Sequence, residues 1–355
     1  MSGLHFHPLR IASVRADTDD ALVLSFEVPP ELDETFRFEP GQHLTLRHPA
    51  LAEDLRRSYS ICAGAGEPLR VGVRRVSGGA FSSWLHAHAA PGQVMDVMQP
   101  QGRFGAALAE RSPRHSLGIA GGSGITPILS IMKTLLARDA SSRFTLLYGN
   151  RLAATTMFKE ELEDLKNRYL TRLVLHPVFS REVVDSPLNT GRLDADKLAQ
   201  FMRLIGHVDE AFICGPHAMN DELEMTLLAA GMAAEHVHVE RFGVPPALAA
   251  QPTEEVHAGD ASSARVSIVR DGVTREIGFQ TSDGNVLAAA ARAGLDVPFS
   301  CKSGVCATCR AKLVAGQVRM ARNFALEKSE VAAGFILTCQ AHPLTERVVV
   351  SFDER

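Results

Sequence analysis

The stretch Pro298-Phe299-Ser300-Cys301-Lys302-Ser303-Gly304-Val305-Cys306-Ala307-Thr308-Cys309 decides how the C-terminal part of this chain is built. A fourth cysteine, Cys339, follows after a long gap. The spacing C-x4-C-x2-C, then a distant C, is the ligand spacing of a plant-type [2Fe–2S] cluster. Each of the two irons takes two thiolates, so one cluster would be held by four residues: Cys301, Cys306, Cys309 and Cys339.

Two alternatives to a cluster stay open on the sequence alone. Structural zinc sites pair two short C-x2-4-C or Cys/His hooks, whereas this run contains one true C-x2-C. The thiols could also be buried and inert, although four of the chain's six cysteines lie in this region. Gly304 lets the loop turn tightly and aim backbone N–H groups at sulfur. The spacing therefore favours the cluster over a zinc site or buried thiols.

Composition excludes several classes of function. The chain has 355 residues, enough for two or three domains, with 45% hydrophobic and 22% charged residues. The net charge of −4 argues against a nucleic-acid surface or a polybasic membrane anchor. No apolar run is long enough to span a bilayer, and no signal peptide is evident at the start. Free thiols without a secretion signal predict a cytoplasmic protein.

The first hundred residues contain short alternating runs, at 22–28, 43–47 and 69–76, separated by proline and glycine turns. This pattern predicts an antiparallel barrel or sandwich. In the run Arg57-Ser58-Tyr59-Ser60, Arg57 and Tyr59 share one face and Ser60 points the other way. An arginine fork suits a pyrophosphate, and a tyrosine ring can lie on a flat aromatic cofactor. An ordinary surface strand is the alternative.

A glycine turn at residues 78–79 precedes a predicted helix that starts with Ala80-Phe81-Ser82. The free N–H groups of such a helix start can bind an anion, but an ordinary capped helix would look the same.

From about residue 115 strands alternate with helices, which predicts a parallel sheet with helices on both faces. The first strand–helix turn reads Gly121-Gly122-Ser123-Gly124-Ile125-Thr126-Pro127, where a dinucleotide phosphate would lie. It is not the G-x-G-x-x-G fingerprint, and a tight packing turn is the alternative. The segment after the second strand has no acid, and Ser180-Arg181 follows the third. A hydroxyl and guanidiniums suit a 2′-phosphate, unless these arginines are simply solvated.

Two histidine pairs, His86/His88 and His236/His238, resemble metal ligands at first sight. No acid or cysteine cluster lies near them in the sequence, so we interpret them as structural or surface histidines. After a Pro/Ala-rich break at residues 244–263, an Asp-Gly hairpin, a helix at 285–293 and a final strand at 348–352 predict a small β-grasp domain.

Taken together, the R-x-Y-S strand, the G-G-S-G-I-T-P turn, the Cys214-Gly215-Pro216 run and the four spaced cysteines resemble the ferredoxin–NADP reductase superfamily fused to a ferredoxin. The resemblance covers nearly the whole chain. It implies a multidomain fold: an FAD-binding antiparallel β-barrel at 1–110, an NADP-binding α/β domain at 111–243, a linker at 244–263 and a plant-type [2Fe–2S] ferredoxin domain of β-grasp type at 264–355.

The resemblance also implies roles for the flavin-site residues. Arg57 would hold the FAD pyrophosphate, Tyr59 would pack on the isoalloxazine ring, and Ser60 would hydrogen-bond the flavin N5 region. The phosphate cradle, through backbone and hydroxyl, implies FAD rather than FMN and would consist of Gly79, Ala80, Phe81 and Ser82.

For NADPH, the resemblance places Cys214-Gly215-Pro216 beside nicotinamide C4, and makes Ser60 and Cys214 the catalytic residues. Ser180 and Arg181 match the pair that binds the 2′-phosphate, with Arg151 adding to it. The nicotinamide and pyrophosphate path would be lined by Gly122, Gly124, Thr126 and Pro127. One departure is that the chain lacks the terminal tyrosine of plant-type reductases, so Phe242 or Glu240 is expected to fill part of that space.

The function implied is electron transfer from NADPH to FAD, then to [2Fe–2S], and on to an oxygenase partner, expected to be a di-iron multisubunit enzyme. NADPH delivers two electrons at once and a [2Fe–2S] cluster accepts one, which is why a flavin is needed between them. A reductase of another aromatic-ring or steroid hydroxylase is the alternative within enzymes. A non-catalytic iron–sulfur or zinc binding module is the alternative from another class.

Overall fold

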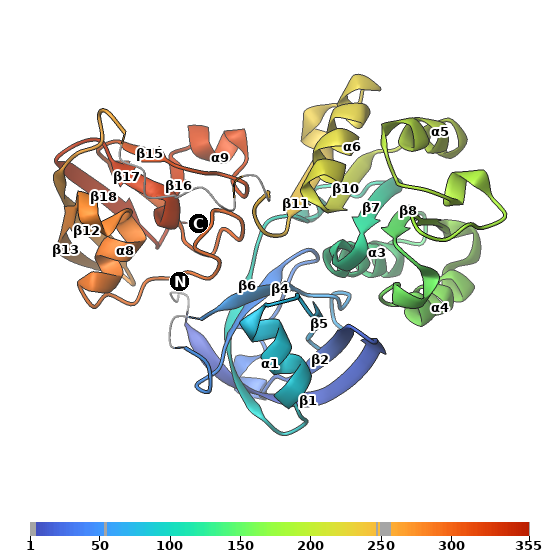
Figure 1. Cartoon of the computed structure of the whole chain (residues 1–355), viewed down its shortest axis with the longest axis horizontal. Helices are drawn as coiled ribbons and strands as arrows, with labels where there is room; N and C mark the ends of the chain where they lie inside the picture. Colours follow the sequence, from blue (N-terminus) through green and yellow to red (C-terminus); the bar gives the residue numbers. More distant parts are fainter. Residues whose placement is uncertain (1–4, 53–54, 246–247, 249–256, 355) are drawn as a thin grey trace. The chain divides into compact units, whose positions relative to one another are not determined.

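The computed structural model describes residues 5–52, 55–245, 248 and 257–354. Most of the predicted linker, residues 246–247 and 249–256, lies outside the described residues. The chain divides into two compact units (Figure 1). One consists of His7–Leu55 and Tyr59–Phe242; the other consists of Gly243–Arg355 with Met1–Phe6 and Arg56–Ser58.

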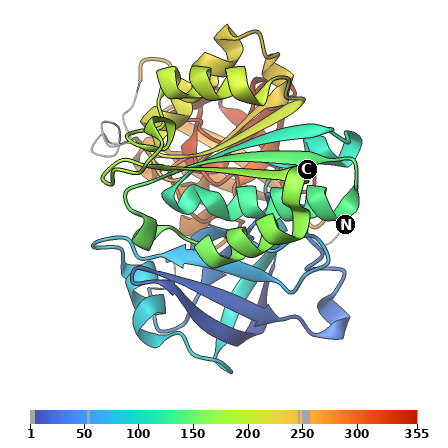
Figure 2. The same cartoon turned by 90° about the vertical axis from the view of Figure 1, so that its right-hand side faces the viewer.

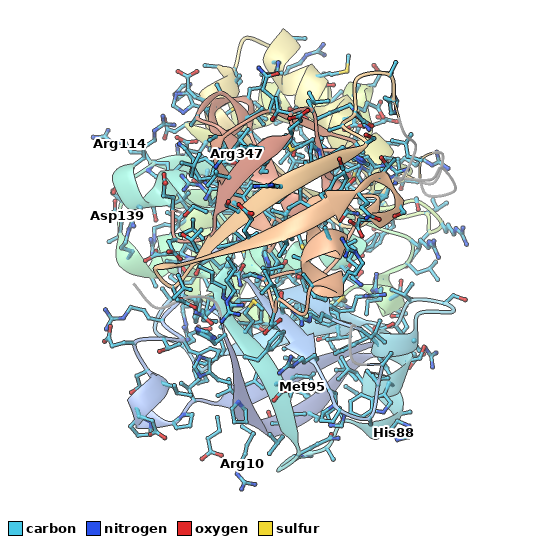
Figure 3. The ribbon with its side chains drawn as sticks, turned by 90° about the vertical axis from the view of Figure 1, so that its left-hand side faces the viewer. Arg10, His88, Met95, Arg114, Asp139 and Arg347 are labelled. Atoms are coloured by element: carbon cyan, nitrogen blue, oxygen red, sulfur yellow. The ribbon has the colours of Figure 1, made fainter. Side chains whose placement is uncertain are left out.

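The N-terminal sheet has six strands in the order β4-β3-β6-β1-β2-β5. Along β2, Leu24 and Phe26 face one apolar cluster while Val23 faces another, as period-2 alternation requires. An isolated bridge from Ile61 to Val71 joins the end of β4 to β5, the opposite edge strand, which closes the predicted barrel. Its elements are β1 (Phe6–Thr18), β2 (Ala21–Glu27), β3 (His43–Arg47), β4 (Arg57–Ser60), β5 (Arg70–Arg74), α1 (Ala80–His88), β6 (Val94–Gln101) and α2 (Ala107–Glu110). Figure 3 labels His88 at the end of α1 and Met95 on β6.

The second sheet is parallel, with the order β11-β10-β7-β8-β9. Helices α3 and α4 cover one face and α5 and α6 the other, as Figure 2 shows. The chain runs one way from β7 to β9 and returns on the other side for β10 and β11. The carboxyl ends of β7 and β10 therefore flank the point where the strand order reverses, which is where open α/β sheets bind ligands. The elements are β7 (His115–Gly121), α3 (Ile125–Arg138), β8 (Arg143–Asn150), α4 (Lys159–Tyr169), β9 (Leu173–Phe179), α5 (Ala195–Ile205), β10 (Glu210–Gly215), α6 (His217–Ala229) and β11 (Val237–Arg241).

The C-terminal unit has a five-stranded sheet with the order β13-β12-β18-β14-β16 and a two-stranded sheet of β15 and β17. Strands β12 and β18 are parallel, and α8 packs on the core of this sheet, as the β-grasp prediction requires. The predicted hairpin turn is confirmed, with positive φ at both Asp271 and Gly272. The elements are β12 (Ser263–Arg270), β13 (Val273–Gln280), α8 (Val286–Arg292), β14 (Arg310–Ala315), β15 (Val318–Met320), α9 (Lys328–Ala332), β16 (Phe335–Leu337), β17 (Ala341–Pro343) and β18 (Arg347–Ser351).

Among the described residues, every helix falls short of the length and apolar character that crossing a bilayer requires.

Candidate functional site

The glycine turn after β7 packs directly against the end of β10. A Cβ added to Gly124 would lie 1.9 Å from the carbonyl oxygen of Cys214. A Cβ on Gly215 would lie 3.0 Å from the backbone nitrogen of Gly121, and Gly122 has φ +55°. Only glycine allows this close approach of two backbones. The structure thus brings the predicted residues of the turn together with Cys214-Gly215-Pro216.

Side chains inside the domain hold this turn in place. The Tyr148 hydroxyl donates to the Gly122 carbonyl at 2.9 Å, and the Thr126 hydroxyl donates to the Ser123 carbonyl at 3.0 Å. Thr126 and Pro127 are both buried in the first turn of α3. A Cβ on Gly122 would lie 3.2 Å from Nη1 of Arg74, which comes from β5 of the barrel. Sequence reasoning missed Tyr148 and Arg74 as supports, because their contacts depend on tertiary packing.

A buried polar group forms where β4, β10 and β11 meet. The Ser60 hydroxyl lies 3.4 Å from Oε2 of Glu240, and Cys214 on β10 is the register partner of Glu240 on β11. Ser60 is 4% exposed and Cys214 is fully buried. Sequence reasoning placed Ser60 and Cys214 here and considered Glu240 only loosely. The sequence feature that could have identified Glu240 is a single acid at the end of the alternating run Val237-His238-Val239-Glu240.

The protonation of this group follows from its burial. Burial raises the pKa of Glu240 to about 8, against the lowering effect of the hydrogen bond from Ser60. Burial, and then the nearby Glu240, raise the pKa of the Cys214 thiol. At neutral pH Glu240 is therefore mostly a neutral acid and Cys214 a thiol. Asn220 at the start of α6 fixes the strand by donating to the Glu240 carbonyl at 3.0 Å.

The start of α1 has the geometry predicted for an anion cradle. Gly79 is its N-cap, and no side chain of the described residues caps the helix at that position. The Ser82 hydroxyl accepts from the Val76 N–H at 3.0 Å and lies 3.4 Å from the Gly79 carbonyl, so it stabilises the turn. Backbone N–H groups at the helix start therefore fit a phosphate better than this hydroxyl does. Beside Ala80, the Phe81 ring is buried with its centroid 6.1 Å from that of Tyr59.

The residues predicted to bind the 2′-phosphate lie together at the ends of β8 and β9. The Ser180 N–H donates to the Asn150 carbonyl at 2.9 Å, and the Arg181 N–H donates to the Arg151 carbonyl at 3.0 Å. Both arginine side chains are exposed. Within the part of the chain that the structure describes, neither guanidinium has a hydrogen-bond or ion-pair partner. Two unpaired cations and a hydroxyl at one edge fit a dianionic phosphate.

The four cysteines of the C-terminal unit form two contacting pairs, Cys301 with Cys306 and Cys309 with Cys339. Two thiol pairs are the donor set that two irons with two thiolates each require. The hydrogen bond from the Cys306 thiol lowers the pKa of Cys301, so one thiol of this pair ionises readily. The loop reaches this arrangement through positive φ at Lys302, Gly304 and Ala307. The residues present fit a [2Fe–2S] cluster.

His236, which directly precedes β11, and His238 on β11 have an acid beside them that the sequence did not reveal. Buried Glu210 lies 2.9 Å from His236 Nδ1 and 2.8 Å from His238 Nε2, and the Arg111 guanidinium donates to it at 2.9 Å. The acid comes from the neighbouring strand β10, so sequence distance concealed it. With an arginine already paired to the carboxylate, the group is a network of ion pairs around a buried glutamate.

Comparison with known proteins agrees with this arrangement. Residues 8–105 match the oxidoreductase FAD-binding domain family, residues 119–224 the oxidoreductase NAD-binding domain family, and residues 268–344 the 2Fe-2S iron-sulfur cluster binding domain family. The chain belongs to the family of oxygenase reductase components that combine these three domains, a ferredoxin–NADP reductase fold fused to a [2Fe–2S] domain. Because the family binds a [2Fe–2S] cluster, the prediction of a cluster is confirmed, and the alternatives of a zinc site or inert thiols are excluded.

Two curated relatives match over nearly their full length. The chain is 46% identical to a subunit of the 1,2-phenylacetyl-CoA epoxidase of Escherichia coli (strain K12), covering 99% of this chain and 98% of that protein. It is 35% identical to the ferredoxin reductase component of 3-ketosteroid-9-alpha-monooxygenase of Mycobacterium tuberculosis (strain CDC 1551 / Oshkosh), covering 99% and 97%. The solved structure of phthalate dioxygenase reductase matches with a TM-score of 0.58 and 24% identity over 98% of each chain, which supports the fold.

Proposed function

We propose that this reductase draws electrons from NADPH and delivers them to a di-iron, multisubunit oxygenase that epoxidises phenylacetyl-CoA in phenylacetate degradation. The observation that carries the proposal is the 46% identity to the Escherichia coli epoxidase subunit across 99% of the chain. It stands well above the 35% identity to the steroid monooxygenase component. The runs Tyr148–Arg151, Phe212–Pro216 and Leu337–Ala341 carry the same resemblance.

Arg57, Tyr59 and Ser60 on β4, with the N–H groups that begin α1, are the residues we assign to FAD. When bound, the flavin converts a two-electron donor into a source of single electrons. The chain contributes the charge of Arg57 for the pyrophosphate, an aromatic face from Tyr59, and the Ser60 hydroxyl near the ring. This hydroxyl already lies 3.4 Å from Oε2 of the partly buried Glu240. A fixed hydroxyl pre-organises the site, because no side-chain freedom is lost when the ring binds.

Cys214, Gly215 and Pro216, together with the turn from Gly122 to Pro127, are the residues we assign to the nicotinamide and pyrophosphate of NADPH. They lie at the point where the strand order reverses. There the absence of a side chain at Gly124 lets the turn after β7 pack directly on the backbone at the end of β10. Burial favours the neutral forms of Cys214 and Glu240, because it raises the pKa of both groups. We expect Cys214→Ala to retain FAD while slowing flavin reduction by NADPH about tenfold or more, in stopped flow. An unchanged rate would remove Cys214 from this role.

We assign the preference for NADPH over NADH to Ser180, Arg181 and Arg151. The support is their position at the carboxyl edge of β8 and β9, with both guanidiniums unpaired among the described residues. We further propose domain boundaries at 1–110, 111–243, 244–263 and 264–355, supported by the three larger sheets, each of which lies within one of the proposed domains. A cytoplasmic location is supported by the cysteines, because none of the six forms a disulfide.

The test is reconstitution with purified oxygenases. The protein would first be titrated anaerobically with NADPH and with NADH while the visible spectrum is recorded. We expect flavin and iron–sulfur bands to bleach at much lower concentrations of NADPH. The reduced protein is then mixed with the phenylacetyl-CoA epoxidase oxygenase subunits or, as the alternative, with the terminal oxygenase of a 3-ketosteroid 9-alpha-monooxygenase. Product from the epoxidase alone supports the proposal, and product from the steroid enzyme alone overturns it.

A further inference from the structure

One side chain next to a cluster ligand has contacts that its packing role does not explain. Gln340 follows Cys339 in the 3-10 turn Thr338–Gln340, and its side chain is fully buried. The amide nitrogen Nε2 donates to the Lys302 carbonyl at 3.1 Å and to the Cys339 carbonyl at 2.8 Å. It also lies 3.5 Å from Sγ of Cys339, within hydrogen-bond range for sulfur, and because the amide has two N–H groups, one of them is shared between this sulfur and a carbonyl. The amide thus connects the loop that carries three ligands to the segment that carries the fourth.

The oxygen of the same amide is buried without a compensating hydrogen bond. Oε1 of Gln340 has no hydrogen-bond partner among the described residues, so its desolvation is not offset. A buried carbonyl left unpaired costs about 1–3 kcal/mol, and an apolar side chain of the same length would avoid that cost. Gly304, with φ +80°, packs on this side chain, since a Cβ there would lie 3.2 Å from Cγ of Gln340. The loop is shaped to hold a glutamine, and what distinguishes glutamine from an apolar residue here is its N–H groups.

We propose that Gln340 is a positioning residue for the cluster and raises its reduction potential by donating an N–H to Sγ of Cys339. Reduction adds one electron to the cluster, and the extra negative charge is shared with the thiolate sulfurs. A hydrogen bond to sulfur stabilises the more negative form, so it favours reduction. The bond to the Lys302 carbonyl keeps the amide oriented while the charge on the sulfur changes. The proposal concerns the cluster alone and does not depend on which oxygenase receives the electrons.

The matched pair of variants is Gln340→Met and Thr338→Val. Methionine keeps the length and flexibility of glutamine but has no N–H. Thr338 lies in the same turn, is equally buried, and donates its hydroxyl to the Cys309 carbonyl at 3.1 Å rather than to a sulfur. Each holoprotein would be checked for iron, labile sulfide and flavin. The cluster would then be titrated with dithionite in the presence of mediators, with the reduced fraction measured by EPR.

We expect Gln340→Met to lower the ratio of reduced to oxidised cluster at a fixed potential by about tenfold, which is about 59 mV for a one-electron couple. Thr338→Val should change the ratio by less than about twofold. An unchanged ratio in fully loaded Gln340→Met, or an equal fall in both variants, would overturn the proposal. If Gln340→Met does not incorporate the cluster, the test uses wild-type protein that carries ¹⁵N in its glutamine side chains. Coupling of a side-chain ¹⁵N to the reduced cluster in pulsed EPR supports the proposal, and the absence of coupling overturns it.

Discussion

The cluster loop and the Ser60–Cys214–Glu240 group, which we propose to lie on one electron path, are assembled in opposite ways. Three cluster ligands lie within the segment 301–309, on a single loop whose positive φ angles bring the thiols together. The three members of the buried group come from β4, β10 and β11, and only barrel packing and sheet register bring them together. When the ligands of a site lie on one loop, their spacing in the sequence indicates the chemistry. When a group is assembled from distant strands, only the folded structure shows which residues meet and how deeply they are buried. The two should therefore respond differently to substitution.

The largest expected effect is loss of the cluster from Cys306→Ala. Removing one of four thiolates leaves an iron without its second protein ligand, so we expect the iron–sulfur absorption and all electron transfer to one-electron acceptors to disappear. Flavin reduction by NADPH should stay within about twofold of wild type, because the FAD and nucleotide residues are untouched. Cys62→Ala, at a buried thiol that follows β4, is the control and should keep both sets of bands. Loss of flavin together with the cluster in Cys306→Ala would contradict this independence.

A comparable test of the assembled site is Gly124→Ala. The new Cβ would meet the Cys214 carbonyl at 1.9 Å, so the β7 turn and the end of β10 must separate. A displacement of about 1 Å near the reacting groups costs roughly 100-fold in rate, and we expect that fall in NADPH-driven flavin reduction, with the cluster retained. Gly278→Ala on β13 is the control, since a Cβ there meets nothing within 4 Å. A normal rate in Gly124→Ala would show that the contact with Cys214 does not position the nucleotide.

A smaller and selective effect is expected at the exposed edge of β8 and β9. Arg181→Ala removes one of two unpaired guanidiniums, so the KM for NADPH should rise about 10- to 100-fold. The KM for NADH should change by less than about twofold, because NADH has no 2′-phosphate. Arg203→Ala on α5, also exposed, should alter neither value. Equal losses for both nucleotides in steady-state assays would place Arg181 outside the phosphate site.

Sequence reasoning succeeded where chemistry is local and was weaker where distant segments meet. Sequence spacing or periodicity was enough to predict four features. These are the cluster, the strand at Arg57–Ser60, the hairpin at Asp271 and the α/β sheet with helices on both faces. The start of helix α4 at Lys159 depends on tertiary structure, since Phe158 adopts φ 58° and its N–H donates to Asp17 in the barrel. No short-range pattern records that contact. Likewise, nothing in the sequence pairs Ser60 with Glu240, or Glu210 with the β11 histidines.

The smallest expected effect is on the pH dependence of the unfolding free energy. It distinguishes two glutamates whose pKa values are shifted in opposite directions. Burial raises the pKa of Glu240 to about 8, above its usual value of 4.5. For Glu210, burial also acts to raise the pKa but is outweighed by the hydrogen bonds from His236, His238 and Arg111, so its pKa is lowered. A carboxyl with a raised folded pKa stabilises the fold below its unfolded pKa, and this stability is lost as pH rises toward the folded pKa. A carboxyl with a lowered folded pKa stabilises the fold above its unfolded pKa, and this stability is lost as pH falls.

Glu240→Gln should therefore flatten the decline in unfolding free energy between about pH 4.5 and 8. In wild type this residue contributes a slope of at most about 1.4 kcal/mol per pH unit. Glu210→Gln is the comparison with the opposite sign, because its carboxyl has a lowered pKa and the variant should alter the loss of stability below about pH 4.5. The measurement is urea unfolding of the holoprotein across pH, followed by flavin fluorescence and circular dichroism. Parallel wild-type and Glu240→Gln curves from pH 5 to 8 would mean that Glu240 is ionised in the folded protein. Ser60 would then face a carboxylate, and burial alone would no longer define the protonation of the assembled site.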